Sequence, residues 1–190
     1  MGIINKNRCV WCGNDPHYIS YHDNQWGVPV YEDKKIFSSL TLEIFQAGLS
    51  WITILKKKEN FYTAFDGFNY RKIAAYSDKK LEALMQDPSI IRNKVKIIST
   101  RENARCFIDI INEFGTFSKY IWRYVDNKPI INHFNKAHDV PSRTRMSDIV
   151  SGDLKKRGFK FIGPTIIYSL MQDIGMVNDH TTNCFRYNQI

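Results

Sequence analysis

The chain has 190 residues, enough for one domain with a well-buried core or for two small lobes that share a cleft. Its formal charge of +8 favours a polyanionic partner such as nucleic acid. It has no run of about 18 apolar residues, and its start lacks the apolar region of a signal peptide. We therefore expect a cytoplasmic protein with reduced cysteines rather than a membrane protein or a disulfide-rich secreted one.

Apolar residues recur at helical spacing along almost the whole chain. This spacing predicts helices over 33–49, 51–65, 79–85, 92–114, 117–125, 147–158 and 164–175. Ser77 is placed to cap the third of these, Gly115 to end the fourth and Pro164 to begin the last. Loops are expected at 66–69 and 127–141, and no strand of alternating polarity is evident. The sequence therefore predicts an all-α fold.

Soft metal ligands stand in two pairs at opposite ends of the chain: Cys9 and His22, then His180 and Cys184. The second pair is spaced by four, so on a helical turn both side chains would share one face. Two thiolates and two imidazoles form a closed tetrahedral zinc site, which leaves no position for a reacting water. From the residues alone the cysteines also fit small buried hydrophobes, because this spacing matches no standard zinc finger.

The remaining cysteines allow other interpretations. Cys9 and Cys12 form a Cys-x-x-Cys pair, which also fits a redox pair or an alternative zinc ligand. Cys106 lies within an apolar helical pattern and is expected in the core.

A basic segment leads into a glycine-bounded turn between 153 and 172. Gly158 ends one predicted helix, and Gly163-Pro164-Thr165 opens the next, as in a helix-hairpin-helix. Glycines let a backbone approach phosphate, and a helix start offers free N–H groups and the positive end of its dipole. Phosphate contacts of this kind are also predicted for Lys155, Lys156, Arg157 and Lys160. A plain helical turn with a solvated basic end is the alternative.

Aromatic residues gather around one carboxylate in the first part of the chain. The aromatic members are Trp11, Tyr18, Tyr21, Trp26 and Trp51. Glu43 lies among apolar neighbours on the helix predicted over 33–49, with Gln46 one turn further on. Aromatic walls with a carboxylate and an amide suit a flat, cationic heteroaromatic ligand. An aromatic core with Glu43 at its solvated rim is the alternative.

Several strings together resemble those of the 3-methyladenine DNA glycosylase I family, from about Arg8 to Cys184. They are Tyr-His-Asp-Asn-Gln-Trp-Gly-Val-Pro at 21–29, Gln-Ala-Gly-Leu-Ser-Trp-Ile-Thr at 46–53 with the lysines at 56–57, Ile-Ile-Arg at 90–92, Leu-Lys-Lys-Arg-Gly-Phe-Lys-Phe at 154–161 and Val-Asn-Asp-His at 177–180. The resemblance implies a single all-α glycosylase domain over 1–190 of the helix-hairpin-helix superfamily. In it, two helical lobes would flank a base-binding cleft, and structural zinc would join the two ends of the chain.

The resemblance also implies roles for individual residues. It implies zinc on Cys9, His22, His180 and Cys184, with Cys12 spare. It places the base among Glu43, Tyr18, Tyr21 and Trp51, with Trp11, Trp26 and Gln46 nearby. Gly48 and Leu49 would approach the gap in the DNA. The hairpin would contact the DNA elsewhere, through Lys155, Lys156, Arg157, Lys160, Gly163 and Thr165.

The implied reaction is hydrolysis of the N-glycosidic bond of 3-methyladenine, with the damaged base flipped out and an abasic site left behind. The chain has Asn178 where the wider superfamily carries a catalytic aspartate, with Asp179 beside it, so no strong general base is expected. No lysine is placed for a Schiff base, which predicts a monofunctional enzyme without lyase activity. A monomer that binds duplex DNA and no membrane is expected.

Two other classes of function remain open from the sequence. A non-catalytic DNA-binding module would explain the charge and the hairpin, but it gives no reason for Glu43 among aromatic residues. A purine-binding protein or small-molecule enzyme would explain the pocket and leave the basic face incidental. A thiol-redox role for Cys9 and Cys12 is the weakest reading, because Cys9 is claimed by the metal.

Overall fold

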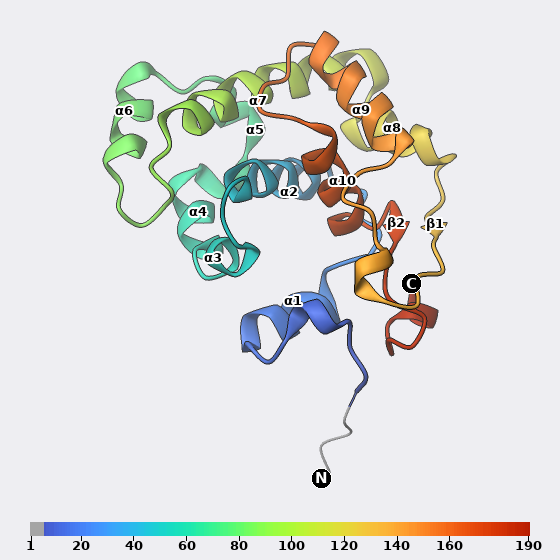
Figure 1. The fold of residues 1–190 in the computed structure, drawn as a ribbon. Coiled ribbons are helices and arrows are strands. Elements are labelled where there is room, and N and C mark those ends of the chain that lie inside the picture. Colours follow the sequence, from blue (N-terminus) through green and yellow to red (C-terminus); the bar gives the residue numbers. More distant parts are fainter. Residues whose placement is uncertain (1–5) are drawn as a thin grey trace.

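The computed structural model describes residues 6–190, so the first five residues, part of the basis for expecting no signal peptide, lie outside it (Figure 1). The α-helices are α1 Pro16–Asn24, α2 Asp33–Gln46, α3 Trp51–Leu55, α4 Lys58–Ala64, α5 Tyr70–Ala74, α6 Asp78–Gln86, α7 Lys94–Phe114, α8 Phe117–Trp122, α9 Arg145–Lys156 and α10 Pro164–Asp173. The 3-10 helices are η1 Val10–Cys12, η2 Asp66–Phe68, η3 Arg123–Val125, η4 Ala137–Asp139 and η5 Tyr187–Gln189. Between residues 6 and 190, none of the helices has the length and apolar character needed to cross a bilayer.

The mostly helical fold confirms the predicted class, and the capping residues act as expected. The Ser77 hydroxyl accepts from the Lys80 N–H at the start of α6, Gly115 follows α7 with a φ of 84°, and Pro164 is the first residue of α10. The helix predicted over 51–65 is instead two helices, α3 and α4, which meet at Lys56 and Lys57. The prediction missed the break because the apolar spacing runs on across it.

Two helices and a small sheet were not predicted. Helix α1 begins with Asp15 as its cap and a proline in its first turn, and α5 begins with Asn69 as its cap. The expectation of no strands is wrong in one place, because β1 (Ile130–Ile131) pairs in parallel with β2 (Val177–Asn178). Each strand has only two residues, too few for alternating polarity to show in the sequence.

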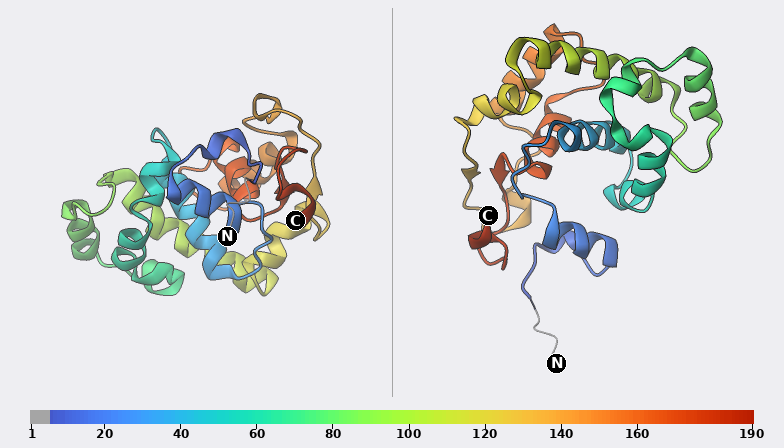
Figure 2. Two further views of the ribbon diagram at one scale, coloured as in Figure 1. Left: turned by 90° about the horizontal axis from the view of Figure 1, so that it is seen from below. Right: turned by 180° about the vertical axis from the view of Figure 1, so that it is seen from behind.

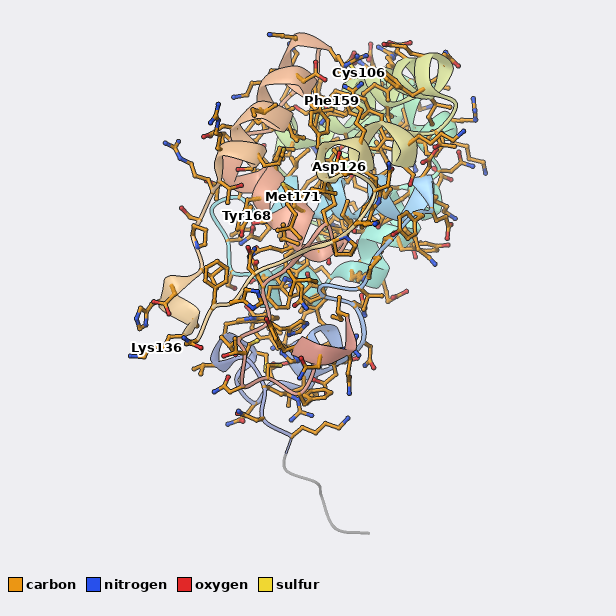
Figure 3. The ribbon with its side chains drawn as sticks, turned by 90° about the vertical axis from the view of Figure 1, so that its right-hand side faces the viewer. Cys106, Asp126, Lys136, Phe159, Tyr168 and Met171 are labelled. Carbon is orange, nitrogen blue, oxygen red and sulfur yellow. The ribbon has the colours of Figure 1, made fainter. Side chains whose placement is uncertain are left out.

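The core is built around α7 and α10. Helix α7 packs against α2, α5, α6 and α8, while α10 packs against α2 and α9. Figure 3 shows Tyr168 and Met171 of α10 in the middle of the molecule, with Phe159 and, on α7, Cys106 above them. The Cys106 side chain packs against this core, as predicted.

A second, smaller cluster lies where the two ends of the chain meet. Cys9, Tyr21, Trp26 and Cys184 are its buried members. In Figures 1 and 2, α1 and the C-terminal segment lie beside each other, on the side of α2 and α10 away from α7. Gly175, just after α10, has a φ of 71°, and a Cβ there would come within 2.5 Å of the backbone of residues 27–29. The close approach aligns the end of α10 with the chain that follows α1.

Candidate active site

The predicted base-binding residues converge on one cavity of about 360 Å³. The cavity is lined by Trp11, Tyr18, Tyr21, Trp26, Glu43, Gln46 and Trp51, together with Cys9, Ala137, Val140, Pro141, Ser169, Gln172, Asp179 and Thr181. All seven side chains that the sequence grouped therefore face one space. Its volume lies within the range of small-molecule sites in proteins.

Three short segments present the aromatic walls. Helix α1 carries Tyr18 and Tyr21, and the Tyr18 hydroxyl accepts from the Ile52 N–H at 3.2 Å, which satisfies a free donor in the first turn of α3. The Trp11 ring meets Tyr18 edge-on at 5.9 Å between centroids and Trp26 at 4.9 Å. Trp51, the first residue of α3, lies 5.3 Å from the Tyr21 ring. Each aromatic side chain that lines the cavity is therefore held in place by contact with another one.

Glu43 is the unusual group in this cavity. It lies on α2 with 4% of its surface exposed, and burial raises its pKa well above the ordinary value of 4.5. The negative charge of Asp173 adds to the shift. Among the described residues, neither a cation nor a hydrogen-bond donor contacts the carboxyl to offset these effects. A carboxyl group in this state is ready to gain a cationic or hydrogen-bonding ligand.

The four predicted metal ligands also converge. The ligand atoms of Cys9, His22, His180 and Cys184 all lie within 4.8 Å of one another, and all four residues are buried. The sequence spacing suggested that His180 and Cys184 share a helical turn, but in the structure they do not lie on a helix. They lie in an irregular segment in which the Cys184 N–H donates to the Thr181 carbonyl at 2.8 Å.

Their spacing fits a tetrahedral zinc ion. Zinc bonds of about 2.3 Å to sulfur and about 2.0–2.1 Å to nitrogen, at tetrahedral angles, place sulfur and nitrogen about 3.5–3.6 Å apart. The His180 Nδ1 atom lies 3.6 Å from the Cys9 sulfur and 3.5 Å from the Cys184 sulfur. The Cys184 sulfur lies 3.4 Å from His22 Nε2. The donor set and its distances therefore suit the ion.

The groups behind these ligands also suit a metal. The second nitrogen of His22, Nδ1, lies 2.8 Å from an Asp23 oxygen, and that of His180, Nε2, lies 3.3 Å from the Trp26 carbonyl. Metal-bound histidines commonly donate their other N–H to such oxygens. Cys12 is not a member of the cluster, and its Sγ contacts the Gly13 carbonyl at 3.8 Å.

The predicted DNA contacts fall into two groups. Leu49 is 40% exposed after Gly48, and Phe161 is 41% exposed at the turn between α9 and α10. Buried Lys96 of α7 connects these two places, because its Nζ donates to the Phe45 and Ala47 carbonyls at 3.0 and 2.6 Å and lies 5.9 Å from the Phe161 ring. Lys96 therefore links the backbone just before Gly48 to the turn that carries Phe161.

The basic residues of the hairpin differ in whether they are exposed or paired with an acidic side chain. Lys155, Lys156 and Lys160 are exposed, as is Thr165 in the first turn of α10 after Gly163. The Arg157 guanidinium instead pairs with Glu113 at 2.6 Å and lies 5.2 Å from the Phe114 ring. Arg157 therefore makes an ion pair within the protein, although the sequence predicted a phosphate contact for it.

Part of the cavity wall was missed by sequence reasoning. Ala137, Val140 and Pro141 come from the polar stretch that was predicted only as a loop. Figure 3 shows Lys136, just before η4, on the outer side of this segment. The pairing of β1 with β2 anchors the loop, and a contact made so far along the chain leaves no local pattern to detect.

Asn178 and Asp179 take different positions. Asn178 is fully buried, donates from Nδ2 to the Tyr187 carbonyl and does not line the cavity. Asp179 lines the cavity, but its Oδ1 accepts from Asn132 at 2.6 Å and its Oδ2 accepts from Tyr168 and Gln172 at 2.6 and 2.7 Å. Its carboxylate is therefore held by three donors.

Comparisons with known proteins identify the family to which the chain is similar. The family model for methyladenine glycosylases matches residues 11–187. The chain is 45% identical to DNA-3-methyladenine glycosylase 1 of Escherichia coli K12, over 95% of this chain and 96% of that protein. A crystal structure of a 3-methyladenine DNA glycosylase I superposes with a TM-score of 0.91, at 46% identity over 94% of this chain and 98% of the other. The Staphylococcus aureus enzyme, solved to explain 3-methyladenine recognition, gives a TM-score of 0.91 at 37% identity, over 95% and 96%.

Proposed function

Because the chain belongs to the methyladenine glycosylase family, we propose that it excises 3-methyladenine from alkylated DNA by hydrolysing the N-glycosidic bond. The observation that carries the proposal is the burial of Glu43 in a cavity walled by aromatic rings. An apolar ligand would gain nothing from a buried carboxyl group and a neutral purine would gain only hydrogen bonds, whereas a cationic purine offers both charge and N–H donors.

The damaged nucleotide must leave the helix before its base can enter the cavity. A methylated base stacks and pairs poorly, which lowers the cost of flipping and contributes to selectivity. Leu49 and Phe161 are two exposed apolar side chains that would fill the gap in the stack. Lys155, Lys156 and Lys160 would bind phosphates near the hairpin without reading the sequence.

Alkylation at N3 leaves the base positively charged while it is still joined to the sugar, so it is a good leaving group. Glu43 would accept hydrogen bonds from the purine edge, while Tyr18, Tyr21 and Trp51 hold its faces. Normal adenine lacks the charge and gains less from the same contacts. Selectivity then comes partly from binding and partly from the lability of the lesion.

Water completes the reaction by attacking the sugar, which leaves an abasic site. Asn178 lies outside the cavity and the Asp179 carboxylate is occupied by three donors, so neither is a free general base. A cationic leaving group makes strong base catalysis unnecessary. No lysine is among the described residues that line the cavity, which supports a monofunctional enzyme without lyase activity.

Zinc would be the resident metal, held by Cys9, His22, His180 and Cys184. Four protein ligands leave it no open position, so the ion supplies structural cross-linking rather than chemistry. Cys9 lines the base cavity and Trp26 packs 4.6 Å from the His180 ring. The metal centre would therefore support one wall of the base pocket, in a helix-hairpin-helix enzyme that acts as a monomer.

The test is base release from methylated duplex DNA, with the freed bases identified by chromatography. Wild type should release 3-methyladenine, and Glu43→Ala should lose most of this release while keeping its helical content and zinc. Glu82→Ala, an exposed change on α6, is the matched control and should behave as wild type. A folded, zinc-loaded wild type that releases no base would refute the proposal and favour a DNA-binding or purine-binding module.

A further inference from the structure

The fold gives no obvious reason for an acidic residue at position 173. Asp173 is the last residue of α10, where the negative end of the helix dipole disfavours an acidic side chain. Among residues 6–190 no lysine, arginine or histidine forms an ion pair with it. A residue that breaks a local rule in this way commonly serves a site rather than the fold.

The hydrogen-bond partner of Asp173 is a residue that lines the base cavity. The Tyr21 hydroxyl donates to Asp173 Oδ1 at 2.6 Å, a short distance typical of a hydrogen bond to a charged acceptor. Tyr21 and Trp51 line the base cavity on one side and a second cavity of about 770 Å³ on the other, and Asp173 lines only the second. Asp173 therefore lies behind the aromatic wall and does not touch the base.

Two physical effects follow from this position. The hydrogen bond fixes the direction of the Tyr21 hydroxyl and draws electron density into its ring, which strengthens attraction for a cation at the ring face. The charge of Asp173 also acts on Glu43, whose pKa it raises, so Asp173 is close enough to attract a cation in the pocket through the wall. Both effects favour a positively charged base and leave a neutral base almost unaffected.

We propose that Asp173 is a positioning residue that sets the preference of the pocket for cationic bases, acting through Tyr21 and through its charge behind the wall. This deepens the proposed function and rests on it for the identity of the base. The geometry of the wall is the support, because Tyr21 both lines the base cavity and donates a hydrogen bond to the Asp173 carboxylate.

The test compares two small ligands that differ in charge. One is 3,9-dimethyladeninium, a permanent cation in which a methyl group stands for the sugar, and the other is neutral 9-methyladenine. Asp173→Asn keeps a hydrogen-bond acceptor but removes the charge, so it should lower the cation-to-neutral affinity ratio by about tenfold. Asp109→Asn, the same change at an exposed site on α7, should leave the ratio unchanged.

A merely structural role predicts a different result. Loss of packing would weaken both ligands equally, and an unchanged ratio for Asp173→Asn would overturn the proposal. Tyr21→Phe provides a second route should the Asp173 variant fold poorly. It removes the same hydrogen bond while leaving Asp173 in place, so it should also lower the ratio, by less than tenfold because the charge of Asp173 remains. An unchanged ratio for Tyr21→Phe would overturn the action through Tyr21.

Excision kinetics separate this proposal from the proposed function. With alkylated duplex DNA, Asp173→Asn should lower kcat/KM for 3-methyladenine release by about tenfold, because the damaged base is still a cation while it is joined to the sugar. Absence of 3-methyladenine release by wild type would refute the proposed function alone, since the affinity ratio is measured without catalysis. An unchanged kcat/KM for Asp173→Asn would overturn the positioning role.

Discussion

The replacement of Glu43 by glutamine should make the folded protein more stable at neutral and alkaline pH while it removes activity. Burial raises the pKa of Glu43 well above its ordinary value of 4.5, and the Asp173 charge raises it further. The folded protein therefore favours the protonated form of Glu43, whereas the unfolded chain ionises freely. Glutamine has nearly the same shape and never titrates, so the substitution isolates the cost of this carboxyl group.

The size and sign of the effect follow from proton linkage. Below pH 4.5 both folded and unfolded states carry a protonated Glu43, so the two variants should differ little. Above that pH, only the unfolded state loses the proton, and the wild type loses about 1.4 kcal/mol of unfolding free energy per pH unit. The loss stops once the pH passes the raised pKa of the folded protein. The advantage of the glutamine variant should therefore rise from pH 4.5 and then level off.

Urea unfolding of both proteins, at pH values from 4 to 9 and constant zinc, measures this difference directly. Other titrating groups are shared by the two variants and cancel in the subtraction. Glu82→Gln, an exposed change on α6, should give a difference that stays near zero at every pH. If the difference in unfolding free energy between Glu43→Gln and wild type did not change with pH, the carboxyl would ionise as readily in the folded protein as in the unfolded chain. The inference that the pocket favours a cation would then lose its support.

Further substitutions check three other parts of the structure. Cys184→Ser should lower zinc content, measured by mass spectrometry, and reduce stability by well over the ~1 kcal/mol of an average substitution; full metal retention would remove Cys184 from the ligand set. Joint replacement of Lys155 and Lys156 by alanine should reduce the salt slope of DNA binding by about 2, and an unchanged slope would argue against the hairpin face. Gly175→Ala should cost about 3 kcal/mol or more in urea unfolding, because its Cβ would meet backbone atoms at 2.5 Å with φ at 71°. Gly152→Ala, in an open part of α9, should instead stabilise by about 1 kcal/mol, and similar values for the two would contradict the close approach at residue 175.

Much of the fold follows from local signals in the sequence. Ser77, Gly115 and Pro164 mark helix ends correctly because capping depends on neighbouring backbone groups. Asp15 and Asn69 carried the same kind of signal for α1 and α5, since each caps a helix whose apolar pattern is too short to notice. The break between α3 and α4 could not be predicted, because tertiary packing places it within a continuous apolar pattern.

The part of the site that is built from uncommon residue types could be predicted from the sequence. Tryptophan, histidine and cysteine stand out in a sequence, and the seven grouped pocket residues do line one cavity. Small or common residues do not stand out, so Ala137 and Ser169 were missed although they line the same cavity. Asp173 was missed for another reason: its importance depends on a hydroxyl 152 positions away in the chain.

The position of the metal cluster explains why a structural ion would matter for base recognition. The segments that carry Trp11, Cys9 and Cys184 are a 3-10 turn and an irregular stretch, and the hydrophobic cluster between them is small. Short segments of this kind bury too little apolar surface to offset the entropy of ordering them. Zinc on four ligands would fix both segments at once, and Trp11 and Trp26 would then be held in place before the base arrives. Loss of the ion should therefore weaken base binding before it disturbs the larger core around α7 and α10, which lies apart from the cluster.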